Sequence, residues 1–115
     1  MKIRIMLLVV MLGIVGRVDA GVRTFYTAGK ILSYCESADV RKQDACTDYL
    51  AGISDATGQW VAWGDMSKRV CKPSGVNTRQ LRKIYIKYAN EHPENLHFAA
   101  ASVVITAFTE AFPCE

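Results

Sequence analysis

The chain has 115 residues, 50% of them hydrophobic and 22% charged, and its formal net charge is +3 at pH 7. A chain of this length forms one small domain, whose buried surface leaves only a modest margin of stability over the conformational entropy of the chain. Part of the positive charge lies in a signal-like N-terminus, so the remaining domain is nearly neutral and lacks the concentrated cationic surface that would indicate a nucleic-acid partner.

The N-terminus has the three parts of a secretory signal peptide. Two basic residues precede an apolar run over residues 5–15, and the Val-Asp-Ala sequence at 18–20 places small or apolar residues at the cleavage positions. A transmembrane anchor is the alternative, but the run is shorter than the roughly 20 residues that cross a bilayer. We therefore expect residues 1–20 to be a cleaved secretory signal peptide and residues 21–115 to be one exported domain without stable membrane insertion.

The exported domain contains an even number of cysteines, which predicts disulfides. Small domains in oxidising compartments commonly use such cross-links to stabilise a limited core. A zinc site is the alternative, but the cysteines are widely spaced and no C-x-x-C motif occurs. We therefore expect two disulfides among Cys35, Cys46, Cys71 and Cys114.

The first half of this domain contains two segments with helical periodicity. The first is expected over residues 25–35, where Ala28, Ile31, Leu32 and Cys35 share one face. The second is expected over residues 44–63, although each of its two interior glycines costs roughly 1 kcal/mol relative to Ala. The apolar face of the second segment, which includes Trp60 as a core residue, consists of Cys46, Tyr49, Leu50, Ile53, Ala56, Trp60 and Val61.

A long loop and a third helix follow. Residues 65–76 contain proline and glycine and show no sustained period, which is typical of a loop. Asn77 followed by Gln80 resembles a capping box, so we expect a helix that ends near Asn90. Its apolar face is Leu81, Ile84, Tyr85 and Tyr88, and its opposite face carries Arg79, Arg82, Lys83 and Lys87. This basic face is either an ordinary solvated surface or a docking surface for an acidic partner or an anionic component of the cell envelope.

A fourth helix is expected to begin at Pro93, a residue that suits a first helical turn, and to continue to about Ala111. One apolar stripe consists of Leu96, Ala100, Val103, Ala107 and Ala111. Further apolar residues lie off this stripe, namely Phe98, Val104, Ile105, Phe108 and Phe112. The segment is therefore either the central helix of the domain or the contributor of a second face to a dimer.

Short connections between consecutive helices favour alternating directions, so we expect a small, disulfide-stapled, all-α four-helix up-down bundle. In such a bundle, Cys35 at the end of the first helix lies at the same pole as Cys46 near the start of the second. Cys71, before the third helix, meets Cys114 after the fourth at the opposite pole. The expected pairs are therefore Cys35 with Cys46 and Cys71 with Cys114.

No arrangement of residues indicates an enzyme. The spacing of His92 and His97 places them about 140° apart on a helix rather than on one metal-binding face. Asp44 and Asp48 share a face, but carboxylates in a first helical turn ordinarily stabilise the helix dipole. The chain also lacks G-x-S-x-G, glycine-rich phosphate-loop and H-E-x-x-H motifs. We therefore expect no catalytic residue, metal or cofactor.

Candidate partner-binding surfaces are residues 37–42, 63–69 and 91–95. The segment 63–69 is preferred, because the Cys71–Cys114 disulfide would hold its base rigid and lower the entropy cost of docking. Trp63 lies away from the core face, beside charged residues, as tryptophans at interface hot spots do. A tryptophan packed under the long loop is the alternative. The candidate partner-binding residues are Trp63, Asp65, Met66, Lys68 and Arg69.

Several motifs, spread over almost the whole exported domain, resemble one known family. They are G-K-I-L-S-Y-C at 29–35, C-T-D-Y-L-A-G-I at 46–53, C-K-P-S-G-V-N-T-R-Q-L at 71–81, Y-A-N-E-H-P-E at 88–94 and A-F-T-E-A-F-P-C at 107–114. Together they resemble the Rap/Tai family, the periplasmic immunity proteins that neutralise peptidoglycan amidases delivered by type VI secretion. Because the matching residues are mostly cysteines, glycines, prolines and core positions, they specify the fold more directly than the activity.

The resemblance implies that residues 21–115 form a Tai-like immunity domain in the periplasm. Such a protein would bind a cognate peptidoglycan amidase effector and occlude its active site, which requires no catalytic residue. The resemblance also implies a homodimer. The alternative is a small periplasmic chaperone or stress-protective helical protein, which would keep the apolar surface of the fourth helix inside a resting dimer and expose it under stress.

Overall fold

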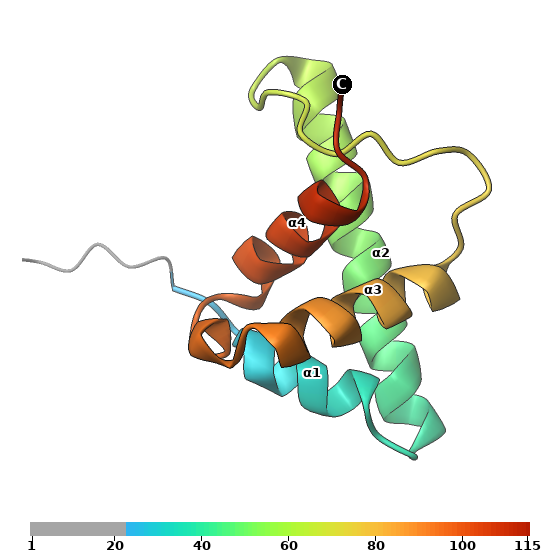
Figure 1. Ribbon diagram of the computed structural model, residues 1–115, viewed down its shortest axis with the longest axis vertical. Helices are drawn as coiled ribbons and strands as arrows, with labels where there is room; N and C mark the ends of the chain where they lie inside the picture. The colour runs from blue at the N-terminus through green and yellow to red at the C-terminus, as the bar shows by residue number, and fades with distance from the viewer. Residues whose placement is uncertain (1–22) are drawn as a thin grey trace, which may run out of the picture.

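The computed structural model describes residues 23–115, so the expected signal peptide lies outside the described residues. The helices are α1 (Ala28–Cys35), α2 (Val40–Trp63), α3 (Thr78–Glu91) and α4 (Ala100–Ala111), with a short 3-10 helix, η1 (Pro93–Asn95), before α4 (Figure 1). Extended structure in this part of the chain is limited to two isolated bridges. The predicted all-α class is therefore confirmed.

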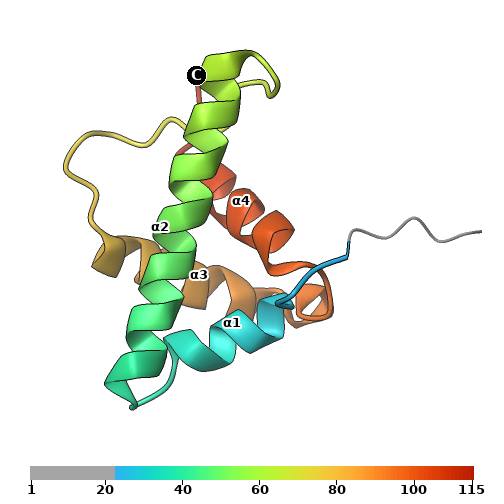
Figure 2. The ribbon, with the colours of Figure 1, turned by 180° about the vertical axis from the view of Figure 1, so that it is seen from behind.

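The longest helix, α2, organises the other three. Helices α1 and α3 lie side by side across its N-terminal half, and α4 crosses it farther along (Figure 1, Figure 2). Helices α3 and α4 pack against each other, and α1 contacts all three of the other helices. The four helices therefore enclose one core, with α2 crossing its neighbours.

The start of α2 lies at Val40, earlier than the expected start at Asp44. Asp39 caps this end, because its Oδ1 accepts a hydrogen bond of 2.9 Å from the Arg41 amide. Val40, Arg41 and Lys42 at the start of the helix are exposed, so no apolar stripe marks this turn. Periodicity alone therefore places the start too late.

Helix α3 begins with the predicted capping box. The Asn77 side chain accepts a 2.9 Å hydrogen bond from the Gln80 amide, and the Gln80 side chain accepts one of 2.9 Å from the Asn77 amide. Farther along, the buried Tyr85 hydroxyl donates over 2.7 Å to the Ala28 carbonyl oxygen. Burial raises the pKa of Tyr85 above its ordinary value, with a smaller contribution from Tyr49. Tyr85 thus joins α3 to α1 through the core.

The expected fourth helix is interrupted after a single turn at Pro93. Beyond this turn, the Phe98 carbonyl oxygen accepts a 2.9 Å hydrogen bond from the Ala28 amide. The Leu96 carbonyl oxygen accepts one of 2.9 Å from the Gly29 amide. Amides in the first turn of a helix have no partner within it, and the carbonyls before α4 satisfy those of α1. Because a continuous helix would direct these carbonyls along its own axis, the predicted start at Pro93 was wrong.

This pairing brings two backbones close together at Gly29. A Cβ atom at this position would lie 3.3 Å from the Leu96 carbonyl oxygen and 3.5 Å from the Leu96 Cβ. The Thr27 side chain caps the same helix end by accepting a hydrogen bond of 3.2 Å from the Lys30 amide. Glycine therefore serves close packing here, rather than an unusual backbone conformation.

Helix α4 occupies a central place in the fold, because it packs against α1, α2 and α3. Val104 and Phe108, which lie off the predicted stripe, are buried. Ile105 and Phe112 are half-buried, whereas Phe98 before the helix is exposed. The apolar surplus of this segment is thus largely used within one chain, as the central-helix alternative expects. The homodimer stays a prediction.

The core contains residues of all four helices, but α2 contributes them mainly from its first half. Trp60, predicted as a core residue, is 44% exposed, so this prediction was wrong. The apolar stripe of α2 continues to Trp60, but none of the other helices extends far enough along α2 to cover this residue. Buried side chains are Ala28, Ile31, Leu32, Cys35, Cys46, Leu50, Thr57, Leu81, Tyr85, Tyr88, Ala89, Ala100, Val103, Val104, Ala107 and Phe108.

Of the helices between residues 23 and 115, none combines the length and apolar character needed to cross a bilayer.

Candidate functional site

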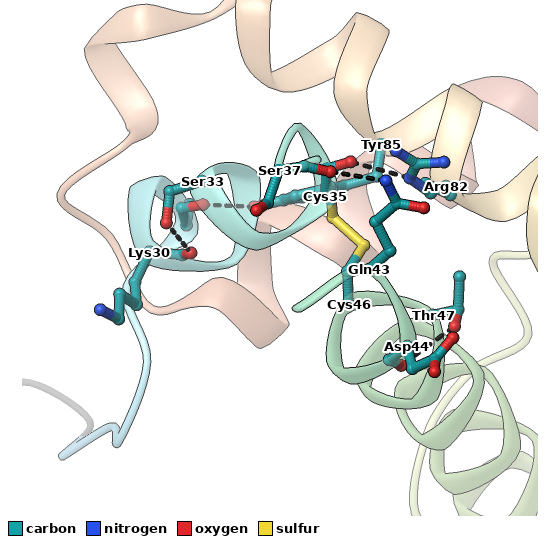
Figure 3. Close-up of a disulfide and its surroundings, with 11 residues drawn as sticks. Lys30, Ser33, Cys35, Ser37, Gln43, Asp44, Cys46, Thr47, Arg82 and Tyr85 are labelled. Atoms are coloured by element: carbon teal, nitrogen blue, oxygen red, sulfur yellow. Dashed lines mark hydrogen bonds between the residues drawn. A yellow bond between two sulfur atoms is a disulfide. The ribbon is translucent and has the colours of Figure 1, made fainter. Parts of the chain in front are cut away.

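The two disulfides, Cys35–Cys46 and Cys71–Cys114, are the pairs that the alternating helices predict. The first pair is fully buried and joins the end of α1 to α2 (Figure 3). Around it, the Gln43 side-chain amide donates to the Ser37 carbonyl oxygen over 2.6 Å. This pole of the molecule is closed by contacts within the chain.

Arg82 belongs to the same closed pole. Its Nε donates to the Cys35 carbonyl oxygen over 2.8 Å and so satisfies a carbonyl at the end of α1 (Figure 3). The expected basic face of α3 therefore loses one of its four cations to an internal contact. Lys87 lies 4.0 Å from Glu91 in an exposed pair, while Arg79 and Lys83 are exposed.

The second disulfide fixes the base of the long loop. Val70 forms an isolated antiparallel bridge with Pro113, and the Cys71 amide donates to the Phe112 carbonyl oxygen over 2.8 Å. The Cys71–Cys114 disulfide adds a covalent link at the same place. The loop between α2 and α3 is therefore anchored near its middle to the C-terminal tail.

A groove of about 610 Å³ separates the anchored loop from α2. Phe108 of α4, itself almost completely buried, contributes to its floor. The other residues that line the groove include Thr57, Gly58, Val61 and Ala62 of α2 and Met66, Lys68, Arg69, Val70 and Lys72 of the loop. A second hollow, of about 530 Å³, lies beside His97 and Phe98, and a third, of about 220 Å³, lies between α3 and α4.

The charge of the groove is mainly positive. Lys68, Arg69 and Lys72 contribute to its lining, whereas Asp55 is the one carboxylate there. Lys72 Nζ donates to the Ser54 hydroxyl over 2.9 Å, which links the loop to α2. The groove therefore combines an apolar floor with cationic groups.

The C-terminal end of α2 projects beside the groove. A Schellman motif ends the helix: Gly64 adopts a positive φ of 81°, its amide donates to Val61, and the Asp65 amide donates to the Trp60 carbonyl oxygen. Trp60 and Trp63 are 44% and 66% exposed. Two tryptophans thus stand at the surface, on a helix end whose backbone is well defined.

The structure separates the five predicted partner-binding residues into two groups. Met66, Lys68 and Arg69 line the groove. Trp63 and Asp65 lie outside its lining, at the exposed end of α2 and just after it. Both groups belong to one continuous segment of chain. Their role in partner binding stays a prediction.

The two histidines and the pair of aspartates weighed as catalytic or metal-binding residues do not come together in one site. His92 Nδ1 lies 3.1 Å from Glu94 Oε1, and its ring stacks on Tyr88. The pKa of the Glu94 carboxyl is lowered by a hydrogen bond from the Glu94 backbone amide and, to a smaller extent, by one from the His92 side chain. His97 is exposed and packs beside Phe98. Within residues 23–115, no three potential ligands gather as a metal site would require. The exposed Asp44 and Asp48 therefore remain ordinary surface carboxylates of α2.

Sequence reasoning missed the α2 wall of the groove. It treated Val61 as a core position and Gly58 only as a weak helix former. The one signal in the sequence was Gly58 itself, a glycine in the interior of a helix. In the structure, packing does not require this glycine, because a Cβ atom there would meet nothing within 4 Å. The groove itself depends on where the loop lies, and periodicity contains no information on that.

Comparison with known proteins identifies the family. A search of curated proteins finds no significant match. The family model of the Rap1a immunity proteins matches residues 27–114, from the cap of α1 to the last cysteine of the second disulfide. The match covers all four helices and both disulfides, and an immunity protein needs a binding surface rather than a catalytic centre. The chain therefore belongs to the Rap1a immunity protein family, whose members bind a cognate secreted effector.

Proposed function

We propose that this protein is a periplasmic immunity protein that binds a peptidoglycan amidase effector delivered by type VI secretion and inhibits it by occluding its active site. Family membership supports the immunity role. The signal-like N-terminus and the two disulfides support export to an oxidising compartment. The amidase as target follows from the resemblance to the Rap/Tai family.

The observation that carries this proposal is the exposed, firmly supported segment 63–69. Trp63 exposes 66% of its surface, and tryptophan is among the residues that contribute most to binding energy at interfaces. The Schellman motif at Gly64 fixes one end of the segment, and the Val70–Pro113 bridge fixes the other. A segment held at both ends loses little conformational entropy on docking, so more of its contact energy appears as affinity.

Inhibition by such a segment is steric. A surface that covers the entrance of an amidase groove prevents the peptide of the cell wall from entering, whatever the chemistry inside. The protein then acts in proportion to the amount of effector bound, without turnover.

Expression of cell-wall amidases in the periplasm tests the proposal. Each candidate amidase is expressed with and without this protein, and lysis is scored. Rescue from one amidase, and from no other, is the expected result. A variant without residues 2–20 is the matched control, because it is expected to accumulate inside the cytoplasm and give no protection. Failure to rescue from any type VI amidase would refute the proposed target.

The alternative function as a chaperone has lost its main support. It required apolar surface on the fourth helix to be available for clients, but Val104 and Phe108 are buried within one chain. Broad suppression of aggregation by the purified protein would restore this alternative. Sedimentation measurements of the free protein test the expected homodimer.

A further inference from the structure

The groove beside the segment 63–69 has its own recognition chemistry. Its floor and walls include the side chains of Phe108, Val61 and Val70, which offer apolar contact. Lys68 and Arg69 bring cationic groups to its loop side. An occupant that matches this lining needs both apolar and acidic groups.

The cations of the groove are not neutralised by ion pairs of the described chain. The ion pairs found between residues 23 and 115 are Lys87–Glu91 and His92–Glu94, and both lie elsewhere. Lys72 donates to a neutral hydroxyl, that of Ser54. The groove therefore retains a positive potential that favours an acidic partner.

Gly58 adds an independent observation. It lies inside α2, where glycine is less favourable than alanine, and it lines the groove. A Cβ atom there would meet nothing within 4 Å, so no contact within the domain requires glycine. Gly52, in the same helix, has equally open surroundings but lies outside the groove lining. A glycine that packing does not require, placed on a groove wall, permits another backbone to approach closely.

We propose that this groove receives an acidic segment of the effector, in which carboxylates flank an apolar side chain and the main chain passes over Gly58. The apolar side chain contacts Val61 and Val70, and the carboxylates meet Lys68 and Arg69. Identification of the occupant as part of the effector rests on the proposed function. The groove would thus supply a second contact beside the segment 63–69, one that depends on the partner's sequence.

The groove can be tested before any effector is known. The probe is an acetylated, amidated pentapeptide with one leucine between two pairs of glutamates, titrated into the 15N-labelled periplasmic protein. The largest amide shifts are expected at Gly58, Val70 and Lys72, and they should decrease with salt. Shifts confined to the basic face of α3, or no shifts at all, would overturn the proposal.

Two matched pairs of variants sharpen this test. Gly58→Ala is expected to weaken peptide binding about tenfold, whereas Gly52→Ala leaves it unchanged. Both substitutions should raise the melting temperature, which shows that lost binding is not lost folding. The double variant Lys68→Gln with Arg69→Gln is expected to abolish the shifts. Its counterpart on α3, Arg79→Gln with Lys83→Gln, should retain them.

The effector experiment separates this inference from the proposed function. If an amidase is neutralised by the wild-type protein but binds Gly58→Ala equally well, the groove is not its contact and the inference fails. If the peptide binds in the groove but no amidase is neutralised, the proposed function fails while the groove remains an acidic-segment site.

Discussion

The two disulfide-linked poles of this protein differ in how they use their polar and aromatic groups. At the Cys35–Cys46 pole, Gln43 and Arg82 donate to carbonyl oxygens of the same chain, and both cysteines are fully buried (Figure 3). At the Cys71–Cys114 pole, two tryptophans stand exposed and a positively charged groove lies open. Both disulfides cross-link the domain, but only the Cys71–Cys114 pole leaves a surface open, which is the surface that we propose a partner covers.

The difference shows how a small domain can hold an exposed surface rigid without burying it. Hydrophobic packing would cover the exposed residues and remove them from recognition. A disulfide, a bridge at Val70 and the ordered end of α2 fix the backbone instead, and they leave the side chains accessible. Both disulfides should therefore contribute to stability, whereas partner binding should depend on the Cys71–Cys114 pole alone.

The largest effect is expected from loss of the Cys71–Cys114 disulfide through Cys71→Ala with Cys114→Ala. Chain-entropy estimates give about 4 kcal/mol for a cross-link of this length. The groove wall should also become mobile, so effector affinity should fall together with stability. Urea unfolding and a binding titration measure the two effects. Wild-type affinity in this variant would contradict the anchoring role of the disulfide.

Loss of the other disulfide, through Cys35→Ala with Cys46→Ala, should cost about 3 kcal/mol because its loop is shorter. Effector affinity should stay at the wild-type level under conditions where the variant is folded. The same titration compares the two poles directly. Equal losses of affinity in both disulfide variants would remove the distinction between them.

Alkaline pH should destabilise the closed core. Burial raises the pKa of Tyr85, and also those of Tyr49 and Tyr88, above the ordinary value of about 10. Because tyrosine is charged when deprotonated, the folded state holds these protons more tightly than the unfolded state does. Stability is therefore fully present below about pH 10 and falls above it, by up to about 1.4 kcal/mol per pH unit for Tyr85, whose pKa is raised most.

Rapid urea unfolding at pH 9 and pH 11 measures this dependence. Tyr85→Phe is the control variant, since it should be less stable at pH 9 but lose less stability on going to pH 11. An unchanged dependence on pH in this variant would show that Tyr85 is not the responsible group.

Asp65→Ser with Lys68→Ser changes the open pole alone. Both side chains are exposed, so the melting temperature should not fall. Binding of the amidase should weaken about tenfold, which corresponds to about 1.4 kcal/mol. Calorimetric titration against the amidase that the wild-type protein neutralises measures the change in affinity. Unchanged affinity would exclude the segment 63–69 as the contact.

The smallest effect belongs to the closed pole. Arg82→Met removes the hydrogen bond to the Cys35 carbonyl oxygen and should cost about 1 kcal/mol of stability. Lys83→Met, its exposed neighbour on α3, should change stability by less than about 0.5 kcal/mol. Equal effects on urea unfolding would show that the Arg82 contact contributes little.

Local signals in the sequence were sufficient for much of the fold. The capping box of Asn77 and Gln80 depends on two residues three positions apart, and the structure contains it. The disulfide pairs follow from helix order and direction, and the structure has these same pairs. Such features can be predicted because each depends on neighbouring residues or on chain order alone.

The errors share a different origin. The helix expected from Pro93 is interrupted because the carbonyls of Leu96 and Phe98 bind amides of α1, far away in the sequence. Trp60 continues the core stripe of α2, but no helix extends far enough to cover it. The groove exists because the loop is tied to the C-terminal tail. Each depends on where distant segments meet, which periodicity cannot specify.

The pairing of residues 26–29 with residues 96–100 has a consequence for how the domain is made. Helix α1 has 8 residues, too few to persist alone in water, where isolated helices need about 12 or more. Its first amides find their partners only when residues 96–98 arrive. A chain that emerges with its N-terminus first must therefore wait for its last helix before its first one is stable. The domain should therefore form in a single cooperative step once its last helix is available.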